Sequence, residues 1–140
     1  LPANALLLEL TESLFVHDLN SARQVIGQLK EIGVAIAIDD FGTGYASMSY
    51  LQRLPVQEVK IDQSFVRYAA TSKRDQEIIA SLAQLAHRLD MLAVAEGVET
   101  AEMAGIVAQL GCDRAQGLLY AGPLPLEEFI AWWRGHAPGR

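Results

Sequence analysis

The sequence has a single cysteine, no long apolar run and no excess of positive charge. Cys112 is the only cysteine in 140 residues, which excludes an internal disulfide and a cysteine metal cluster. No run reaches the roughly 18 apolar residues that a membrane span needs, and no basic-then-apolar segment of a secretion signal is visible. We therefore expect a cytoplasmic protein, with any membrane anchor lying outside these residues.

The net charge of -6 bears on the partners that the chain binds. It argues against binding to a nucleic-acid polymer, because such binding needs a basic surface. It does not exclude a small phosphate-bearing substrate, since acidic residues gathered around divalent cations present positive charge to a phosphate.

The sequence does contain enough apolar residues for one folded domain. Hydrophobic residues make up 51% and charged residues 20%, and neither a linker nor an internal repeat divides the chain. Five apolar runs have the length of strands and are apolar on both faces, as strands of a parallel sheet are. These runs are Leu6 to Leu10, Val34 to Asp39, Val56 to Ile61, Leu92 to Ala95 and Ala115 to Leu118.

Segments with helical periodicity alternate with the predicted strands. They are Asn20 to Ile32, Ser72 to Leu89, Thr100 to Leu110 and a last helix that begins near Leu126. Ser72 and Thr100 are candidate N-caps of their helices. The alternation, repeated five times, predicts right-handed crossovers and a parallel sheet of about five strands.

Two α/β architectures fit this pattern, an open doubly wound sheet and part of a (βα) barrel. The first strand is not followed by a glycine-rich phosphate loop, which weakens the doubly wound, nucleotide-binding alternative. In the last helix, Phe129, Ile130 and Trp133 share one stripe. We predict core packing rather than ligand stacking for Trp132 and Trp133.

Acidic residues stand at the downstream ends of successive predicted strands. The polar residues at these ends are Glu9 and Glu12, Asp39 and Asp40, Lys60 and Asp62, Glu96 and Glu99, and finally Gln116. The carboxyl ends of parallel strands converge on one face of a βα fold, where active sites form. A single acid at such a place is often only a helix cap or a dipole partner, but four successive strands ending in carboxylates predict a shared site.

Carboxylates gathered in this way would repel one another without a counter-charge. Hard divalent cations with oxygen ligands, Mg²⁺ or Mn²⁺, provide one. The adjacent pair Asp39-Asp40 is suited to a two-metal site, which favours hydrolysis of phosphodiesters. Lys60 is the one cation among these acids. It is either a structural salt bridge or a group that orients the attacking water, and a lysine among carboxylates stays protonated.

These residues fall into motifs that resemble, in order and spacing, those of the EAL domain family. The motifs are Leu8-Glu9-Leu10-Thr11-Glu12-Ser13, Asp39-Asp40-Phe41-Gly42-Thr43-Gly44-Tyr45, Lys60-Ile61-Asp62-Gln63-Ser64-Phe65-Val66, Ala95-Glu96-Gly97-Val98-Glu99-Thr100, Gln116-Gly117 and Pro123-Leu124-Pro125. The resemblance implies a modified TIM barrel that hydrolyses cyclic-di-GMP to linear pGpG with Mg²⁺ or Mn²⁺, and that often forms a homodimer.

The resemblance also implies a role for each matching residue. By motif, Glu9, Asp39 and Asp40 are metal ligands, and Lys60 and Glu96 place or activate the water. Glu12 steadies the loop from Asp39 to Tyr45, which is linked to the dimer surface. The residues implied to surround the substrate and the second metal are Asp62, Glu99 and Gln116.

Residues 1–140 correspond to the C-terminal part of a single EAL-type barrel domain in this comparison. A full barrel takes ~250 residues, and the Glu-Ala-Leu and asparagine motifs of the family would precede Leu1. We therefore expect open sheet edges, an uncovered interior and little or no activity from this piece alone. Two positions depart from the family pattern, Leu118 for an aromatic residue and Gly122 for a basic one. A non-catalytic cyclic-di-GMP-binding or protein-interaction module is the alternative.

Overall fold

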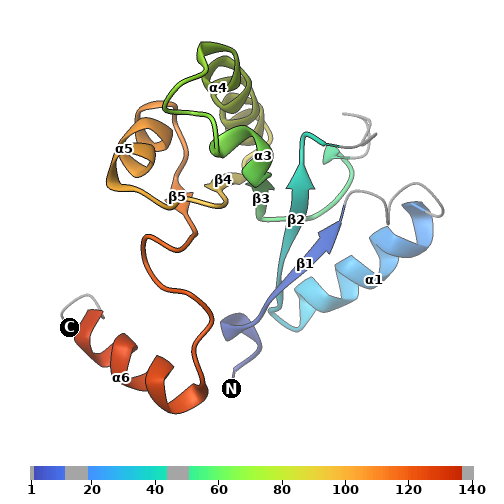
Figure 1. Cartoon of the computed structure of the whole chain (residues 1–140). Helices are drawn as coiled ribbons and strands as arrows, with labels where there is room; N and C mark the ends of the chain where they lie inside the picture. Colours follow the sequence, from blue (N-terminus) through green and yellow to red (C-terminus); the bar gives the residue numbers. More distant parts are fainter. Residues whose placement is uncertain (1, 12–18, 44–50, 137–140) are drawn as a thin grey trace.

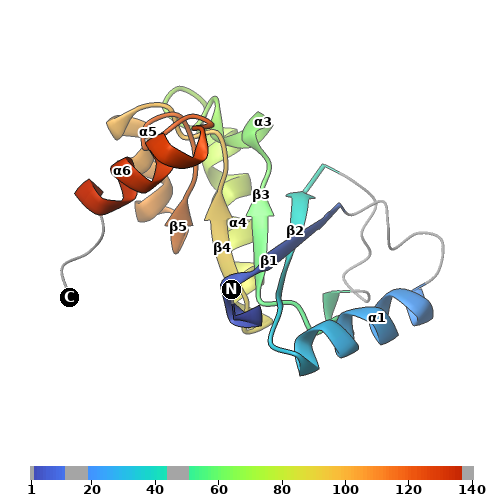
Figure 2. The ribbon, with the colours of Figure 1, turned by 90° about the horizontal axis from the view of Figure 1, so that it is seen from below.

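The fold is built on one parallel sheet whose strands follow chain order. The computed structural model describes residues 2–11, 19–43 and 51–136. The strands lie side by side in the order β1-β2-β3-β4-β5 (Figure 1, Figure 2). Their bounds are β1 Leu7–Thr11, β2 Ala35–Phe41, β3 Glu58–Ile61, β4 Leu92–Ala95 and β5 Arg114–Ala115. This order has no reversal, so it is that of a (βα) barrel segment rather than a doubly wound sheet.

The helices follow the strands as predicted. Their bounds are η1 Ala3–Ala5, α1 Leu19–Glu31, α3 Gln63–Val66, α4 Lys73–Arg88, α5 Ala101–Gln109 and α6 Leu126–His136. The two predicted N-caps are confirmed, because the Ser72 hydroxyl accepts from the Asp75 N–H at 3.3 Å and the Thr100 hydroxyl from the Met103 N–H at 3.2 Å. The short helix α3 was not predicted from the sequence.

The fifth strand is shorter than the sequence suggests. We predicted a strand over 115–118, but β5 contains only Arg114 and Ala115. From Gln116 onward the backbone bonds to the loop after β4: the Val98 N–H donates to the Gln116 carbonyl at 3.0 Å, and the Leu119 N–H to the Val98 carbonyl at 3.1 Å. Gln116 therefore lies just beyond the strand, in a turn.

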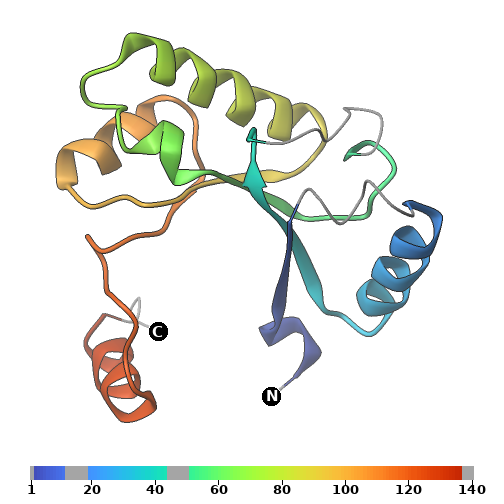
Figure 3. The same cartoon turned by 45° about the vertical axis from the view of Figure 1, so that its right-hand side comes forward.

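The hydrophobic core lies between the convex, outer face of the sheet and the helices that cover it. α1 packs against β2, α4 against β3 and β4, and α5 against β5. Figure 3 shows these three helices on the convex side of the curved sheet and α6 on the other side. The fully buried side chains between sheet and helices include Ile26, Ile36, Ile38, Val59, Ile61, Val66, Ile79 and Val107. The apolar runs thus produce a sheet covered on one face by amphipathic helices.

The prediction that Trp132 and Trp133 of α6 pack in the core is wrong. No residue of α6 is buried, and Phe129, Ile130 and Trp133 are 46%, 39% and 53% exposed. α6 stands apart from the outer helices, so its aromatic rings pack on one another instead, with Trp132 stacked on His136 at 4.7 Å between centroids. No helix in the described part of the chain is long and apolar enough to span a bilayer.

The sheet is open, as expected. β1 and β5 are edge strands, and Leu6, just before β1, and Leu7 and Leu8 in it are 46%, 41% and 40% exposed. Cys112 is half-buried, and burial together with the Asp113 charge raises the pKa of its thiol to about 11. The thiol therefore stays protonated at neutral pH, which agrees with a structural role.

Asp113 joins α4 to the sheet, and its removal is expected to lower stability. Its Oδ2 accepts from the Ala93 N–H at 2.8 Å and lies 2.8 Å from His87 Nε2. Burial alone would raise the pKa of Asp113, but the bonds from Ala93 and His87 outweigh it and lower that pKa. A carboxyl whose pKa is lower in the folded than in the unfolded state stabilises the fold at any pH above the unfolded-state pKa. This stabilisation is lost as the pH falls through the folded-state pKa.

We therefore expect Asp113→Asn to lower the free energy of unfolding by about 1 kcal/mol at pH 7. The difference in unfolding free energy between this variant and wild type should become smaller when the pH is below the ordinary pKa of aspartate. Urea unfolding across pH measures it, with Glu77→Gln, an exposed acid on α4, as the control. A difference that stays constant down to pH 3 would contradict the assignment.

Candidate active site at the carboxyl ends of the strands

An irregularity in β2 brings two neighbouring aspartates to the same place. Ile38 pairs with Val59 and Phe41 with Ile61, so β2 has one residue more than β3 between these pairs. The extra residue forms a bulge, and Asp40 there has a φ of 54°, in the left-handed region. Carboxylate oxygens of Asp39, Asp40 and Glu96 consequently all lie within 4.8 Å of one another.

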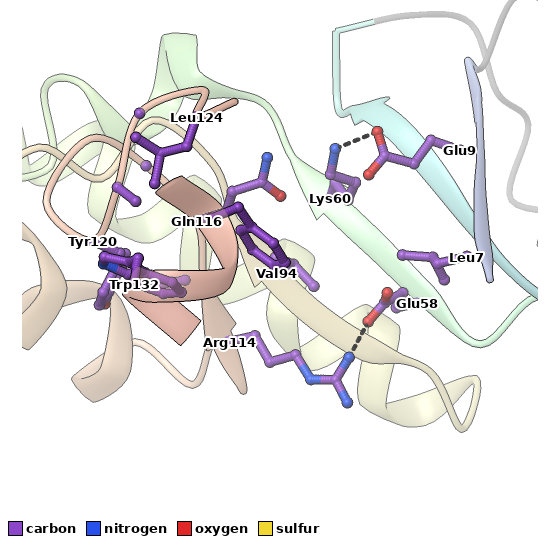
Figure 4. A pocket seen from close by; sticks show the side chains of 15 residues that line it. Leu7, Glu9, Glu58, Lys60, Val94, Arg114, Gln116, Tyr120, Leu124 and Trp132 are labelled. Atoms are coloured by element: carbon purple, nitrogen blue, oxygen red, sulfur yellow. Dashed lines mark hydrogen bonds and ion pairs between the residues drawn. The ribbon is translucent and has the colours of Figure 1, made fainter. Parts of the chain in front are cut away.

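Lys60 stands at the centre of the site. It is 4% exposed on β3. Its Nζ lies 2.8 Å from Glu9 Oε2, 2.6 Å from Glu96 Oε1 and 3.2 Å from Asp39 Oδ1. These partners come from β1, the end of β4 and β2, so one ammonium connects the ends of four neighbouring strands. The close-up shows the Lys60 and Glu9 side chains pointing toward each other (Figure 4).

The electrostatics of the site are those of an acid cluster with too few cations. Burial alone would lower the pKa of Lys60, but the hydrogen bonds with Glu9 and Glu96 raise it above its ordinary value, so this lysine stays charged. Burial raises the pKa of Glu96 against the opposing effect of Lys60. Loss of solvent, then the charges of Asp39 and Asp62, raise the pKa of Asp40.

One oxygen in the cluster lacks a hydrogen bond. Asp39 Oδ1 is buried and has no hydrogen-bond partner among the described residues. Its one charged neighbour of opposite sign in the described cluster is Lys60 Nζ, 3.2 Å away, which Glu9 and Glu96 share. A buried carboxylate oxygen with so little compensation, surrounded by surplus negative charge, fits a hard divalent cation. The donor set present therefore suits hard divalent cations as a class.

Of the other predicted site residues, the structure places Asp62 and Gln116 near this cluster. Asp62 caps α3, its Oδ1 accepting from the Ser64 N–H at 2.9 Å, and sits beside Asp40. Gln116 lines the same cavity as Glu9 and Lys60. Glu99 is exposed on the loop after β4 and is not part of the cluster. Glu12 lies outside the described residues.

A cavity of about 550 Å³ opens on the concave face beside the cluster (Figure 4). Its polar lining includes Glu9, Lys60 and Gln116, and its aromatic lining includes Tyr120 and Trp132. The cavity also contains an ion pair that sequence reasoning missed, Glu58–Arg114. The period of two along β3 places Glu58 on the same face as Lys60, but no sequence signal identifies its partner on β5.

The position of Asp40 in the bulge predicts how its replacement changes stability and metal binding. Asp40→Asn removes repulsion with Asp39 and Asp62 and keeps a residue that tolerates the left-handed region. We expect the metal-free domain to become more stable by about 0.5 kcal/mol, since the group is largely exposed and screened. Stabilisation by added Mn²⁺ should fall.

Asp90→Asn is the matched control for this change. Asp90 is exposed and also left-handed, with a φ of 58°, but it lies outside the acid cluster. Thermal unfolding with chelator and with Mn²⁺ compares the two variants. Equal responses to Mn²⁺ in both would show that Asp40 is not a metal ligand.

Comparison with known proteins identifies relatives across most of the chain. An EAL domain model matches residues 1–123. A cyclic di-GMP phosphodiesterase of Pseudomonas aeruginosa, NbdA, is 40% identical over 130 residues, which are 91% of this chain and 17% of NbdA. The chain spans about a fifth of the length of the first curated relatives that it matches, 20% in each case.

Solved structures share the fold at similar identity. The structure of P. aeruginosa MucR phosphodiesterase in complex with c-di-GMP superposes with a TM-score of 0.86 at 41% identity, covering 92% of this chain and 52% of that one. A Klebsiella pneumoniae BlrP1 complex with manganese and c-di-GMP gives 0.80 at 35% identity, covering 88% and 31%. The predicted partial TIM-type barrel is thereby confirmed, with its sheet open in this chain.

Proposed function

Because the chain belongs to the EAL domain family, we propose that residues 1–140 form the C-terminal part of one barrel domain that hydrolyses cyclic-di-GMP to linear pGpG. The observation that carries this proposal is the cluster of acids around Lys60 at the carboxyl ends of the strands. The complexes of MucR and BlrP1 with c-di-GMP support the choice of substrate.

Three carboxylates serve as metal ligands in this proposal. Glu9, Asp39 and Asp40 supply oxygens, and the buried Asp39 Oδ1 supports this role because its compensation in the described structure is incomplete. Bound Mg²⁺ or Mn²⁺ supplies charge stabilisation at the phosphate and a more acidic water. The manganese in the BlrP1 complex supports the ion class.

Lys60 and Glu96 act on the water. The Lys60 ammonium is held by three carboxylates, so it donates hydrogen bonds and stabilises developing negative charge rather than accepting a proton. Glu96 lies 2.6 Å from it and accepts the proton of the attacking water. Lys60 thus orients the carboxylate of Glu96, which acts as the general base.

The substrate lies on the concave side of the sheet. Gln116 lines the cavity next to Lys60 and contacts a nucleotide. Asp62, beside Asp40, and Glu99, exposed on the loop after β4, are the other substrate-binding residues in this proposal. Leu118, 66% exposed, offers no ring for a guanine to stack on. Glu12 holds the loop from Asp39 to Tyr45, through which two copies of the domain associate as a homodimer in the cytoplasm.

Hydrolysis assays on the complete domain test the proposal. Cyclic-di-GMP should be converted to pGpG with Mg²⁺ or Mn²⁺ and remain intact with chelator. Binding of cyclic-di-GMP without turnover would support the non-catalytic module instead. Absence of both binding and turnover, with metal bound, would leave only a role in protein interaction.

A further inference from the structure

One ion pair on the concave face lies outside the acid cluster. Arg114 Nη1 donates to Glu58 Oε2 at 2.8 Å. The Glu58 side chain is 5% exposed, whereas that of Arg114 is 59% exposed. A carboxylate so deeply buried is costly without a partner, and Arg114 is the partner that the structure supplies (Figure 4).

The pair connects two strands that are not neighbours. Glu58 pairs in register with Leu92 of β4, and Arg114 pairs with Val94 of the same strand. The side chains therefore reach across β4, from β3 to β5. Glu58 lies two residues before Lys60 on β3, and so on the same face of the sheet. Arg114 lies two residues before Gln116, and both line the same cavity as Glu58 and Lys60.

β5 is held in the sheet mainly by hydrogen bonds to β4 and to the loop after β4. It contains two residues and is an edge strand. Around it, the Asp113 N–H donates to the Ala93 carbonyl at 2.8 Å, the Gln116 N–H to the Ala95 carbonyl at 2.9 Å and the Val98 N–H to the Gln116 carbonyl at 3.0 Å. Lys60, in contrast, is fixed by its own three ion pairs. These bonds join β5 only to β4 and its loop, whereas Arg114 joins it to β3. Without this side-chain link, we expect β5 and Gln116 to shift more than Lys60.

We propose that Glu58 and Arg114 are positioning residues that set Gln116 at the correct distance from Lys60 for substrate binding. This inference rests on the proposed function, because Gln116 is there a substrate contact. The pair acts through the placement of β5 and does not touch the reacting atoms.

Steady-state kinetics of the complete domain test this role. Arg114→Met should raise KM for cyclic-di-GMP roughly ten-fold and change kcat by no more than about two-fold. Arg114→Lys keeps the charge and should recover most of the loss. Arg74→Met, which removes an exposed arginine on α4, is the control and should match wild type.

The double variant Glu58→Gln/Arg114→Met guards against a folding defect. It removes the buried charge together with its partner, so its melting temperature should lie near that of wild type while KM stays raised. The sum of the stability losses of Glu58→Gln and Arg114→Met should exceed the stability loss of the double variant. A double variant with wild-type KM, or Arg114→Met lowering only the melting temperature, would overturn the proposal.

A second readout separates this inference from the proposed function. The side-chain amide resonances of Gln116 in the nucleotide-free domain should shift in Arg114→Met and stay in place in Arg74→Met. If wild type does not turn over cyclic-di-GMP, the proposed function fails, and this shift still decides whether the pair positions Gln116. Unchanged resonances in Arg114→Met would show that it does not.

Discussion

Lys60→Met is expected to lower kcat for cyclic-di-GMP hydrolysis in the complete domain by about 10³-fold. The ammonium connects Glu9, Asp39 and Glu96 at 2.8, 3.2 and 2.6 Å. A methionine of similar length fills the space but can neither donate to the water nor orient Glu96. Substrate binding through Gln116 should persist, so KM should change far less than kcat.

The same substitution should also reveal the charge imbalance of the site. Without metal, three carboxylates would face one another with no cation, and we expect a loss of about 3 kcal/mol of unfolding free energy. Added Mn²⁺ should restore part of it, because the ion takes over the neutralising role. Lys73→Met, at an exposed position in α4, is the control. A Lys60→Met domain with near-wild-type kcat would remove the lysine from the mechanism.

Gly117→Ala is expected to disrupt the turn that carries Gln116. A Cβ at this position would overlap the backbone oxygen and nitrogen of Val98. The same Val98 groups bond to Gln116 and Leu119 at 3.0 and 3.1 Å, so the two segments cannot separate without losing both bonds. We expect a loss of about 3 kcal/mol or more, because backbone cannot yield as a side-chain end does.

Gly105→Ala in α5 is the matched control for Gly117→Ala. A Cβ at Gly105 would meet nothing within 4 Å, and alanine in a helix interior should stabilise the domain by about 0.5–1 kcal/mol. Urea unfolding measures both variants, and calorimetry with cyclic-di-GMP measures the loss of binding in Gly117→Ala. Equal stability of the two variants would show that the close approach to Val98 is unimportant.

The elements that could be predicted are those with local or repeating signals. The caps Ser72 and Thr100 follow from side-chain chemistry, and both are confirmed. The convergence of Glu9, Asp39, Lys60 and Glu96 follows from parallel strands, whose carboxyl ends meet on one face. Neither inference requires knowledge of distant contacts.

The features that escaped prediction depend on register or on distant surfaces. The bulge at Asp40 appears only when β2 is aligned on β3. The Glu58–Arg114 pair needs the alignment of both strands on β4. The placement of α6 depends on which surface faces its stripe, and periodicity identifies an apolar side without identifying what covers it.

The central claim is that the strand-end carboxylates hold divalent metal ions for phosphodiester hydrolysis. Anomalous diffraction from crystals of the complete domain, grown with Mn²⁺ and cyclic-di-GMP, tests it most directly. We predict manganese peaks beside the phosphate, within coordination distance of Glu9, Asp39 and Asp40. Crystals with bound cyclic-di-GMP and no manganese peak at Glu9, Asp39 or Asp40 would contradict the claim.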